Sequence, residues 1–470
     1  MTADRARLGF FAILLGYFAI ILDGSVLNVA IPAIRRGLST PMAGAQWVLN
    51  GYTLTLAALL LTAGALGDRV GLRRMLLAGM GLFTVASAAC AAAPGLGVLI
   101  AARVAQGVGA AALLPATLAL IPHLFATAAA RARAAVIWVA VGAVAVAVGP
   151  LAGGLLIDAL SWRAIFAINL PVGLASAGLA AFSVPETPRY RRAVDHAGQL
   201  AAAAALGLLT AGLILSGSAG WASPATLTML AGGLVAGVVF WRIERRSAHP
   251  MLPPSFLRVR ERATAVSSAA LMGFTFYGTL FVMSLYFQQV RDWSPGMAGV
   301  GLLPLTVGST IGPLLLYRPL AKRYGHPVML LAGFACSALG TAVLGWLGPA
   351  TAYPVALSGL LLTGVASTIA FSALTSLLIA STPPEQAGLG SGVQNTTRQS
   401  GALIAVAILG SVLNTSSLAS RLPAAFIIVG AAEVAGVTLA GWNLSGRDHA
   451  GRRTQPPEPG PARQSSAACD

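Results

Sequence analysis

Apolar runs long enough to span a membrane recur along the whole 470-residue chain. About 20 apolar residues in a helix cross the hydrocarbon core of a bilayer, so each run predicts a transmembrane helix. Only 9% of the residues are charged and 56% are hydrophobic, whereas a soluble globule carries about a quarter charged residues. We therefore predict an all-α, polytopic membrane protein with fourteen transmembrane helices. The predicted spans lie near residues 9–32, 45–66, 75–93, 97–121, 134–157, 164–184, 198–216, 225–243, 264–289, 296–317, 328–348, 353–380, 399–414 and 424–442.

The basic residues gather in alternate loops between the predicted spans. The formal net charge is +16, which in a soluble protein would suggest nucleic acid as a partner. Here 24 of the 30 Lys and Arg residues fall in segments that share one side of the membrane with the N-terminus. The positive-inside rule then predicts a multi-pass protein of the plasma membrane with both termini in the cytoplasm. We therefore predict that the chain lies in a lipid bilayer and does not bind nucleic acid.

An internal repeat divides the chain into two halves. The string MLLAG occurs at Met75–Gly79 and at Met329–Gly333, each time after a short basic loop with Arg and Gly in the same register. Duplicated halves with a substrate site between them are typical of secondary transporters. We predict an N-terminal six-helix bundle, a linker with two extra central helices, a C-terminal six-helix bundle and a disordered cytoplasmic tail. These divisions are 1–184, 185–263, 264–444 and 445–470.

The first predicted span carries a carboxylate, Asp23, roughly 22 Å along a helix that starts at Leu8. A charged side chain inside a bilayer costs about 2.5–3.5 kcal/mol on insertion scales, so it usually faces a polar cavity and serves a function. We expect Asp23 in a central cavity, where the conformation and a cationic substrate set its proton occupancy. The alternative is that headgroups merely solvate it near the helix end.

Two more charges lie inside predicted spans. Arg103 stands near the start of the fourth span with Gln106 one turn later, and it is either a functional charge or one that snorkels to the interface. Glu433 lies in the middle of the last span and is either a second titratable site or a structural partner. The three cysteines suggest neither a disulfide framework nor a metal site. No catalytic constellation or ATP-binding motif is found, so energy for transport would come from an ion gradient.

The loop after the second span reads GALGDRVGLRR. Its glycines permit a tight turn and close helix approach, and its acid and arginines can form a charge network at the inner helix ends. Such a network would act as a cytoplasmic gate, because its charges meet only when those ends close. The residues concerned are Gly64, Asp68, Arg69, Gly71, Arg73 and Arg74.

Small residues gather in the fifth predicted span, which contains the string GPLAGG. Small side chains allow close helix packing, and a proline removes a backbone donor and bends a helix. In addition to ordinary packing, we expect this helix to provide a hinge or a tight seal against the other half. The residues concerned are Gly149, Pro150, Gly153 and Gly154.

Six motifs, in order along nearly the whole chain, resemble the major facilitator superfamily and its fourteen-helix drug:proton antiporter branch. Gly64–Arg74 is similar to the signature loop between the second and third helices. LDGSVLNVAIP resembles the first-helix motif, with Ser25 where Thr is commoner, and RVAQGVGAA resembles the fourth-helix motif, whose Arg is implicated in proton transfer. GPLAGG resembles the fifth-helix antiporter motif, with Ala145 where many members have Gly. The other two strings are WRAIFAINLPVG and GLGSGVQNTTRQSG.

The resemblance implies a proton-coupled secondary exporter that works by alternating access, is not an enzyme and needs no cofactor. Its substrates would be drugs, dyes, lipophilic cations or a toxic metabolite of the cell, and its coupling residues would be Asp23 and Arg103. Glu433 is added to these coupling residues because of its position in the last span. We expect a monomer. A proton-coupled uptake symporter is the alternative among transporters, although the antiporter-type fifth helix argues against it. A non-transporting receptor or assembly subunit is the alternative from another class.

Overall fold

The computed structural model describes residues 3–189, 195–383, 386–414 and 417–453, and these ranges contain helices but no strand. Helices suit a lipid environment, because each one bonds its backbone polar groups internally. The first elements are α1 (Ala3–Gly37), α2 (Met42–Val70), α3 (Leu72–Ala91), α4 (Leu96–Ala119), α5 (Ile121–Leu124), α6 (Ala128–Ala159), α7 (Ala164–Ala167), α8 (Asn169–Ser183), α9 (His196–Ala219) and α10 (Pro224–Arg246). The later elements are η1 (Phe256–Arg258), α11 (Arg260–Leu285), η2 (Tyr286–Val290), α12 (Pro295–Ile311), η3 (Gly312–Tyr317), α13 (Arg318–Tyr324), α14 (His326–Gly345), α15 (Tyr353–Ser381), α16 (Ala387–Val412) and α17 (Leu418–Arg453).

Within the described ranges, twelve helices are long and apolar enough to cross a membrane. The number is thirteen if α12 and the segment Leu315–Tyr324, which meet at a bend of 44°, form one span. Pro313 lies at this bend and has no backbone N–H to donate, which explains the interruption. Helix α16 is excluded because residues 394–400 are polar throughout. The prediction of an all-α protein with many spans is confirmed, while the number of fourteen spans and the division into two six-helix bundles stay predictions.

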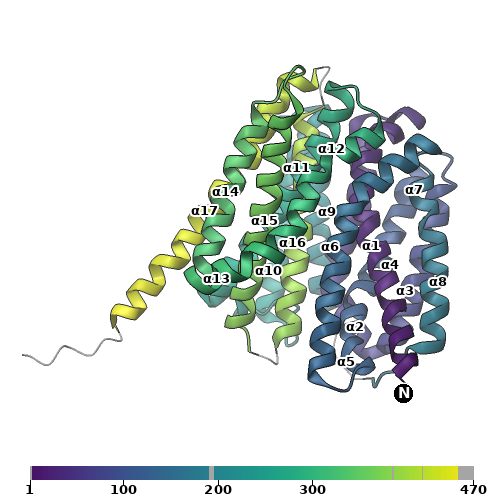
Figure 1. Ribbon diagram of the computed structural model, residues 1–470, viewed down its shortest axis with the longest axis vertical. Coiled ribbons are helices and arrows are strands. Elements are labelled where there is room, and N and C mark those ends of the chain that lie inside the picture. The colour runs from purple at the N-terminus through teal and green to yellow at the C-terminus, as the bar shows by residue number, and fades with distance from the viewer. Residues whose placement is uncertain (1–2, 190–194, 384–385, 415–416, 454–470) are drawn as a thin grey trace, which may run out of the picture.

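The helices form two groups that lie side by side, α1 to α8 in purple and blue and α11 to α17 in green and yellow (Figure 1). In the first group α1 packs on α6 and α8, and α4 packs on α2 and α3. In the second group α11 packs on α16 and α17, and α14 packs on α15 and α17. Between the groups, α2 packs on α16 and α6 packs on α12. This crossed pairing of second with fifth spans is what a duplicated pair of halves would produce.

The two extra helices lie at the edge of this arrangement. Helix α9 packs on α2 and α16, and α10 packs on α9. Only 11% of the most apolar stretch of α10 is buried, against 83% of the corresponding stretch of the helix that begins at Arg260. The side chain of Thr228 on α10 is exposed and its hydroxyl donates to the carbonyl of Pro224 on the same helix. These observations place α10 on the outside of the described bundle.

The C-terminal helix is longer than the sequence predicts. Helix α17 extends to Arg453, so the predicted disordered tail at 445–470 is wrong for residues 445–453. These residues contain no proline, so the helical hydrogen-bond ladder can continue through them even though the apolar run has ended. The rest of that tail, residues 454–470, lies outside the described residues.

Glycines bring α11 and α16 together backbone to backbone. A Cβ atom at Gly401 of α16 would overlap the carbonyl oxygen of Ala270, and one at Gly273 of α11 would overlap the carbonyl oxygen of Arg398. Neither obstacle is the end of a flexible side chain, so a larger residue can be admitted only if a helix moves. Close approach of this kind replaces the hydrophobic effect as the source of packing energy between helices in lipid.

We predict that Gly401→Ala lowers the melting temperature of the purified protein in detergent. The added methyl must displace a backbone, and overpacking costs typically about 1–3 kcal/mol. Gly430→Ala in α17 is the matched control, because a Cβ atom there meets nothing within 4 Å and alanine is the better helix former. Equal melting temperatures for Gly401→Ala and the wild type would contradict the close approach of α11 and α16.

Candidate functional site

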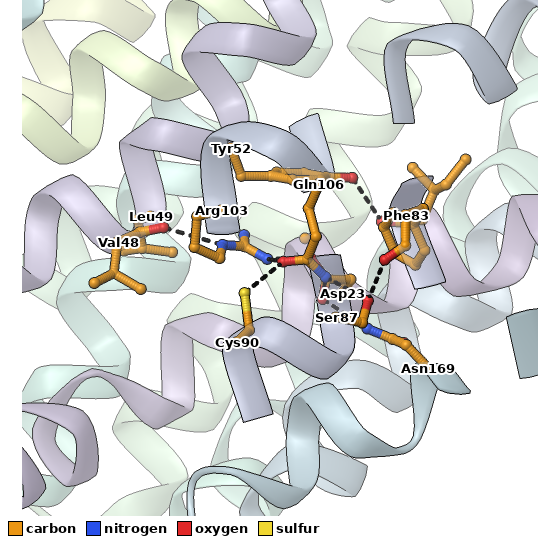
Figure 2. Close-up of polar contacts among 12 residues, drawn as sticks. Asp23, Val48, Leu49, Tyr52, Phe83, Ser87, Cys90, Arg103, Gln106 and Asn169 are labelled. Carbon is orange, nitrogen blue, oxygen red and sulfur yellow. Dashed lines mark hydrogen bonds and ion pairs between the residues drawn. The ribbon is translucent and has the colours of Figure 1, made fainter. Parts of the chain in front are cut away.

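A buried ion pair joins α1 to α4. The Arg103 guanidinium donates through Nη1 to Oδ2 of Asp23 at 2.5 Å (Figure 2). Both residues are only 1% exposed. An isolated charge at this depth is costly, but each of these charges cancels the other. The two intramembrane charges found separately in the sequence are therefore one unit, and Arg103 does not snorkel to an interface.

Neutral polar groups complete the surroundings of the carboxylate. The Asn169 amide, from the start of α8, donates to Oδ1 of Asp23 at 2.9 Å. The Gln106 amide donates to the same oxygen at 3.4 Å and to the hydroxyl of Ser87 at 2.7 Å. Its own carbonyl accepts from Arg103 at 2.8 Å. The carboxylate of Asp23 is thus held by groups from α4 and α8 (Figure 2).

The guanidinium is fixed on its other sides by α2. Nε of Arg103 donates to the backbone carbonyl of Val48 at 3.1 Å. The Tyr52 ring lies 4.4 Å from the centre of the guanidinium, and the Phe166 ring lies 5.6 Å from it. Aromatic faces attract a cation, and this attraction is stronger in the absence of water. The hydroxyl of Tyr52 donates to the carbonyl of Ile20 on α1 at 3.2 Å, so one side chain contacts both the pair and the helix that carries Asp23.

A cavity of about 50 Å³ lies beside this cluster, between the two helix groups. It is lined from the first group by Gly24, Asn28, Tyr52 and Thr53 among others, and from the second by Tyr277 and Gln399. Asp23 does not line it. The expectation that Asp23 faces a central cavity is therefore wrong in this structure: its carboxylate pairs with Arg103 inside the N-terminal group, and Tyr52, which lies against Arg103, lines the cavity instead.

Glu433 lies in the other helix group and is not part of the Asp23 cluster. Its side chain is completely buried, and Oε1 accepts from the hydroxyls of Ser337 at 2.6 Å and Thr341 at 3.1 Å. Oε2 is buried without a hydrogen-bond partner. No cation among the described residues lies within ion-pair distance of it. The structure thus separates the three sequence-predicted coupling residues into a pair and a single acid.

The glycines of the fifth span hold α6 against α1. A Cβ atom at Gly149 would overlap the hydroxyl of Ser25, and one at Gly153 would overlap the side chain of Val26. The hydroxyl of Ser25 itself donates to the carbonyl of Ala145 on α6 at 3.3 Å. The small residues of the antiporter-type string therefore set the distance between two helices of one group.

The same string also seals α6 against α12 in the other group. A Cβ atom at Gly154 would overlap the carbonyl oxygen of Pro295, and one at Gly299 would overlap that of Pro150. At the end of this contact the carboxylate of Asp158 accepts from the Ser294 hydroxyl and from the backbone N–H of Gly296, both at 2.8 Å. This seal lies at the end of the bundle opposite to the loop of residues 64–74. We call this opposite end, which includes residues 159–163 and 291–294, the far end.

The segment of residues 64–74, predicted as a loop, is helical except for Gly71, and it is anchored to the chain that follows α8. Gly71 adopts a φ of 102°, which glycine tolerates and other residues rarely do, and it separates α2 from α3. Arg73 pairs with Glu186 at 2.6 Å, and Nε of Arg74 lies 3.8 Å from the same carboxylate. The backbone N–H of Leu72 donates to the Thr187 hydroxyl at 2.8 Å.

Sequence reasoning placed the gate charges within the loop itself and missed Glu186 as their acidic partner. The only available signal was that Glu186 is an acid beside an arginine-rich segment. Asn169 and Gln106 were also not assigned roles, although the same rule that singles out charges inside apolar runs applies to buried amides. Of the remaining gate residues, Arg69 is exposed, and a Cβ atom at Gly64 would meet nothing within 4 Å.

A buried charge cluster beside a cavity between two packed helix groups is the arrangement of a membrane transporter. The chain belongs to the Major Facilitator Superfamily, whose family model matches residues 13–406. The resemblance read from the six motifs is thereby confirmed at the level of the family.

Several relatives have names that refer to drug resistance. The multidrug resistance protein Stp of Mycobacterium tuberculosis is 36% identical over 401 residues, which cover 85% of this chain and 74% of the relative. The methylenomycin A resistance protein of Bacillus subtilis is 34% identical, with 89% and 90% covered. The tetracenomycin C resistance and export protein of Streptomyces glaucescens is 32% identical, with 94% and 84% covered.

A similar fold is found in a bacterial homologue of the human drug peptide transporters PepT1 and PepT2. The TM-score is 0.64, and the match covers 96% of this chain and 100% of the other. The sequence identity is 16%, so this likeness concerns the fold alone.

We predict that the Asp23 and Arg103 side chains are energetically coupled. Asp23→Asn or Arg103→Gln alone leaves a buried charge without its counterion, which costs about 3–5 kcal/mol. The double variant removes both charges and should melt at a higher temperature than the sum of the two single losses predicts. Melting temperatures of the wild type and the three variants in detergent give this comparison. Strictly additive losses would show that the pair does not act as a unit.

Proposed function

We propose that this protein is a proton-coupled exporter of drugs or other lipophilic compounds, which works by alternating access. The observation that carries the proposal is the fully buried Asp23–Arg103 pair. The Tyr52 ring lies against the Arg103 guanidinium and also lines a cavity between the helix groups, so this side chain connects the pair to the cavity. The names of the relatives support export as the direction of transport. A proton moved inward supplies about 1.4 kcal/mol per pH unit of the gradient and about 2.3 kcal/mol per 100 mV of membrane potential.

The mechanism follows from what a proton does to the ion pair. A proton on Asp23 removes the negative charge that holds Arg103, so the guanidinium loses its counterion and must find other acceptors. Tyr52 packs on that guanidinium and also lines the cavity. A shift of Arg103 therefore moves a wall of the substrate cavity, and a substrate that presses on Tyr52 acts on the ion pair in return. Proton and substrate binding are coupled in this way without direct contact.

We further propose that all fourteen predicted helices cross the membrane, with both termini in the cytoplasm. Helix α12 crosses together with its bent continuation α13, and α16 crosses because α2, α9 and α11 pack on it and cover its polar part. The positions of the basic residues support this orientation. Helices α9 and α10 then stand outside the transport path, and the protein is complete as a monomer.

Alternating access requires seals at both ends of the cavity. At the far end, hydrogen bonds join the groups: the Ser284 hydroxyl donates to the carbonyl of Asn28 at 2.9 Å, and the Gln288 amide donates to that of Val29 at 3.0 Å. We propose that this end, together with the Asp158 contact, is the closed extracellular seal. The segment of residues 64–74 then belongs to the cytoplasmic seal. Pro150 and Gly154 form the surface on which the halves move, while Gly149 and Gly153 hold α6 against α1.

The central test is substrate flux in proteoliposomes driven by an imposed pH gradient. We expect Asp23→Asn to insert into the membrane and to lose gradient-driven flux, because an amide does not titrate. Asp23→Glu should retain part of the flux. Asp4→Asn is the control, since that carboxylate is exposed. Wild-type rate and pH dependence in Asp23→Asn would refute the coupling role and make Glu433 or Arg103 the next candidate, and absence of flux in the wild type would favour a receptor.

We predict that Asp68→Asn slows turnover while substrate binding and membrane insertion stay largely intact. The charges of the loop should affect the balance between inward-open and outward-open states, not the substrate site. Lys322→Gln is the matched control, because Lys322 occupies the equivalent position in the second repeat. Flux rates at equal protein amounts measure the effect, and wild-type turnover in Asp68→Asn would argue against a gate at this loop.

A further inference from the structure

Helix α16 carries a cation deep inside its length, Arg398. It lies eleven residues after Ala387, which is roughly 16 Å along the helix axis and beyond the reach of its side chain to the helix start. Nη1 donates to the hydroxyl of Tyr277 at 3.1 Å, and Nη2 donates to Oδ1 of Asn395 at 3.3 Å. Both acceptors are neutral, so the positive charge is not compensated by either of them.

Among the described residues, no carboxylate lies within ion-pair distance of Arg398. Its Nε is buried without a hydrogen-bond partner. A guanidinium has five N–H donors, and the two hydrogen bonds above use only two of them. The contrast with Arg103 is direct, because that arginine has a carboxylate, an amide and a backbone carbonyl as acceptors.

The uncompensated charge adjoins the cavity between the helix groups. Tyr277, whose hydroxyl accepts from Arg398, lines that cavity, and so does Gln399, the next residue on α16. The residues that line the cavity include no acid. The nearby acid Asp23 is already neutralised by Arg103, and Glu433 is enclosed by α14 and α17. Arg398 does not itself line the cavity but contacts it through Tyr277, so a cationic compound there would lie near one positive charge and no free negative one.

We infer that the substrate is an amphipathic organic anion, with a carboxylate or an ionised phenol or enol that pairs with Arg398. This deepens the proposed export function and rests on it. A guanidinium fork matches two coplanar oxygens, and such a pair is strong where water is excluded. The rings of Tyr277 and Phe371, 5.9 and 5.7 Å from the guanidinium centre, provide apolar surface beside the charge. The proton site at Asp23 is separate, so an anion and a proton need not compete for one group.

The test compares two dyes of similar size on the same xanthene scaffold, the anionic carboxyfluorescein and the cationic rhodamine 6G. Fluorescence anisotropy with purified full-length protein at neutral pH, without any gradient, gives the dissociation constant of each. We expect the wild type to bind the anion at least about tenfold more tightly than the cation. Arg398→Gln should weaken anion binding by about tenfold, equivalent to about 1.4 kcal/mol, and leave cation binding unchanged or improved.

Two further variants make the result specific. Arg398→Lys keeps the charge but not the fork, so its affinity for the anion should lie between those of the wild type and Arg398→Gln. Arg245→Gln removes one exposed positive charge at the end of α10 and should bind both dyes as the wild type does. If Arg398→Gln does not elute as a folded protein, the wild type still gives an answer, because it should bind the anion more tightly than the cation.

The inference is overturned if the wild type prefers the cation, if it binds neither dye, or if a folded Arg398→Gln binds the anion with wild-type affinity. The proposed function fails in a different way. In that case the anion binds with the expected preference, and an imposed pH gradient drives no flux of it in proteoliposomes. Binding without a gradient therefore tests the substrate class, and flux with a gradient tests the coupling.

Discussion

The pairing of Asp23 with Arg103 is the interaction on which the N-terminal helix group depends. A carboxylate and a guanidinium, both 1% exposed, can stay at this depth only while each neutralises the other. Their demand for hydrogen bonds determines what surrounds them: Gln106 from α4, Asn169 from α8 and the carbonyl of Val48 from α2 all point to one place. The cluster therefore fixes the relative positions of four helices, counting α1. Adding a proton to Asp23 would change the balance of these contacts.

The contact between the halves depends on a different physical feature, the absence of side chains. Gly154 of α6 faces the carbonyl of Pro295, and Gly299 of α12 faces the carbonyl of Pro150. Two smooth helix surfaces can slide or separate with few side chains to rearrange, and in lipid no large hydrophobic penalty opposes their separation. The charge cluster and this contact thus differ: the first joins helices within a group through polar side chains, and the second joins the groups through close backbone approach with few side chains.

The sequence predicted the fold class well, because membrane spans are specified by local composition, and it singled out Asp23 and Arg103, because charges in apolar runs are rare. The sequence could not show that Asp23 and Arg103 pair, because α1 and α4 are brought together only by tertiary packing. For the same reason, the sequence analysis placed Asp23 at the cavity. Glu186 escaped notice because nothing local distinguishes a surface acid with partners from one without. The end of α17 was placed too early, since loss of hydropathy does not end a helix. Arg398 stood inside a recognised string, but its missing counterion could be seen only in three dimensions.

The polarity of α16 has a consequence for how the chain is made. Residues 394–400 of α16 are seven successive polar residues. A helix with such a segment is poorly retained in lipid if it enters the membrane without packing partners. Its packing partners α2, α9 and α11 are all synthesised earlier in the chain, so they are available to receive it. Helix α9, one of the two additional helices, packs on α16 and would cover polar surface that lipid disfavours. If α16 crosses the membrane as proposed, its retention would depend on contacts with these earlier helices.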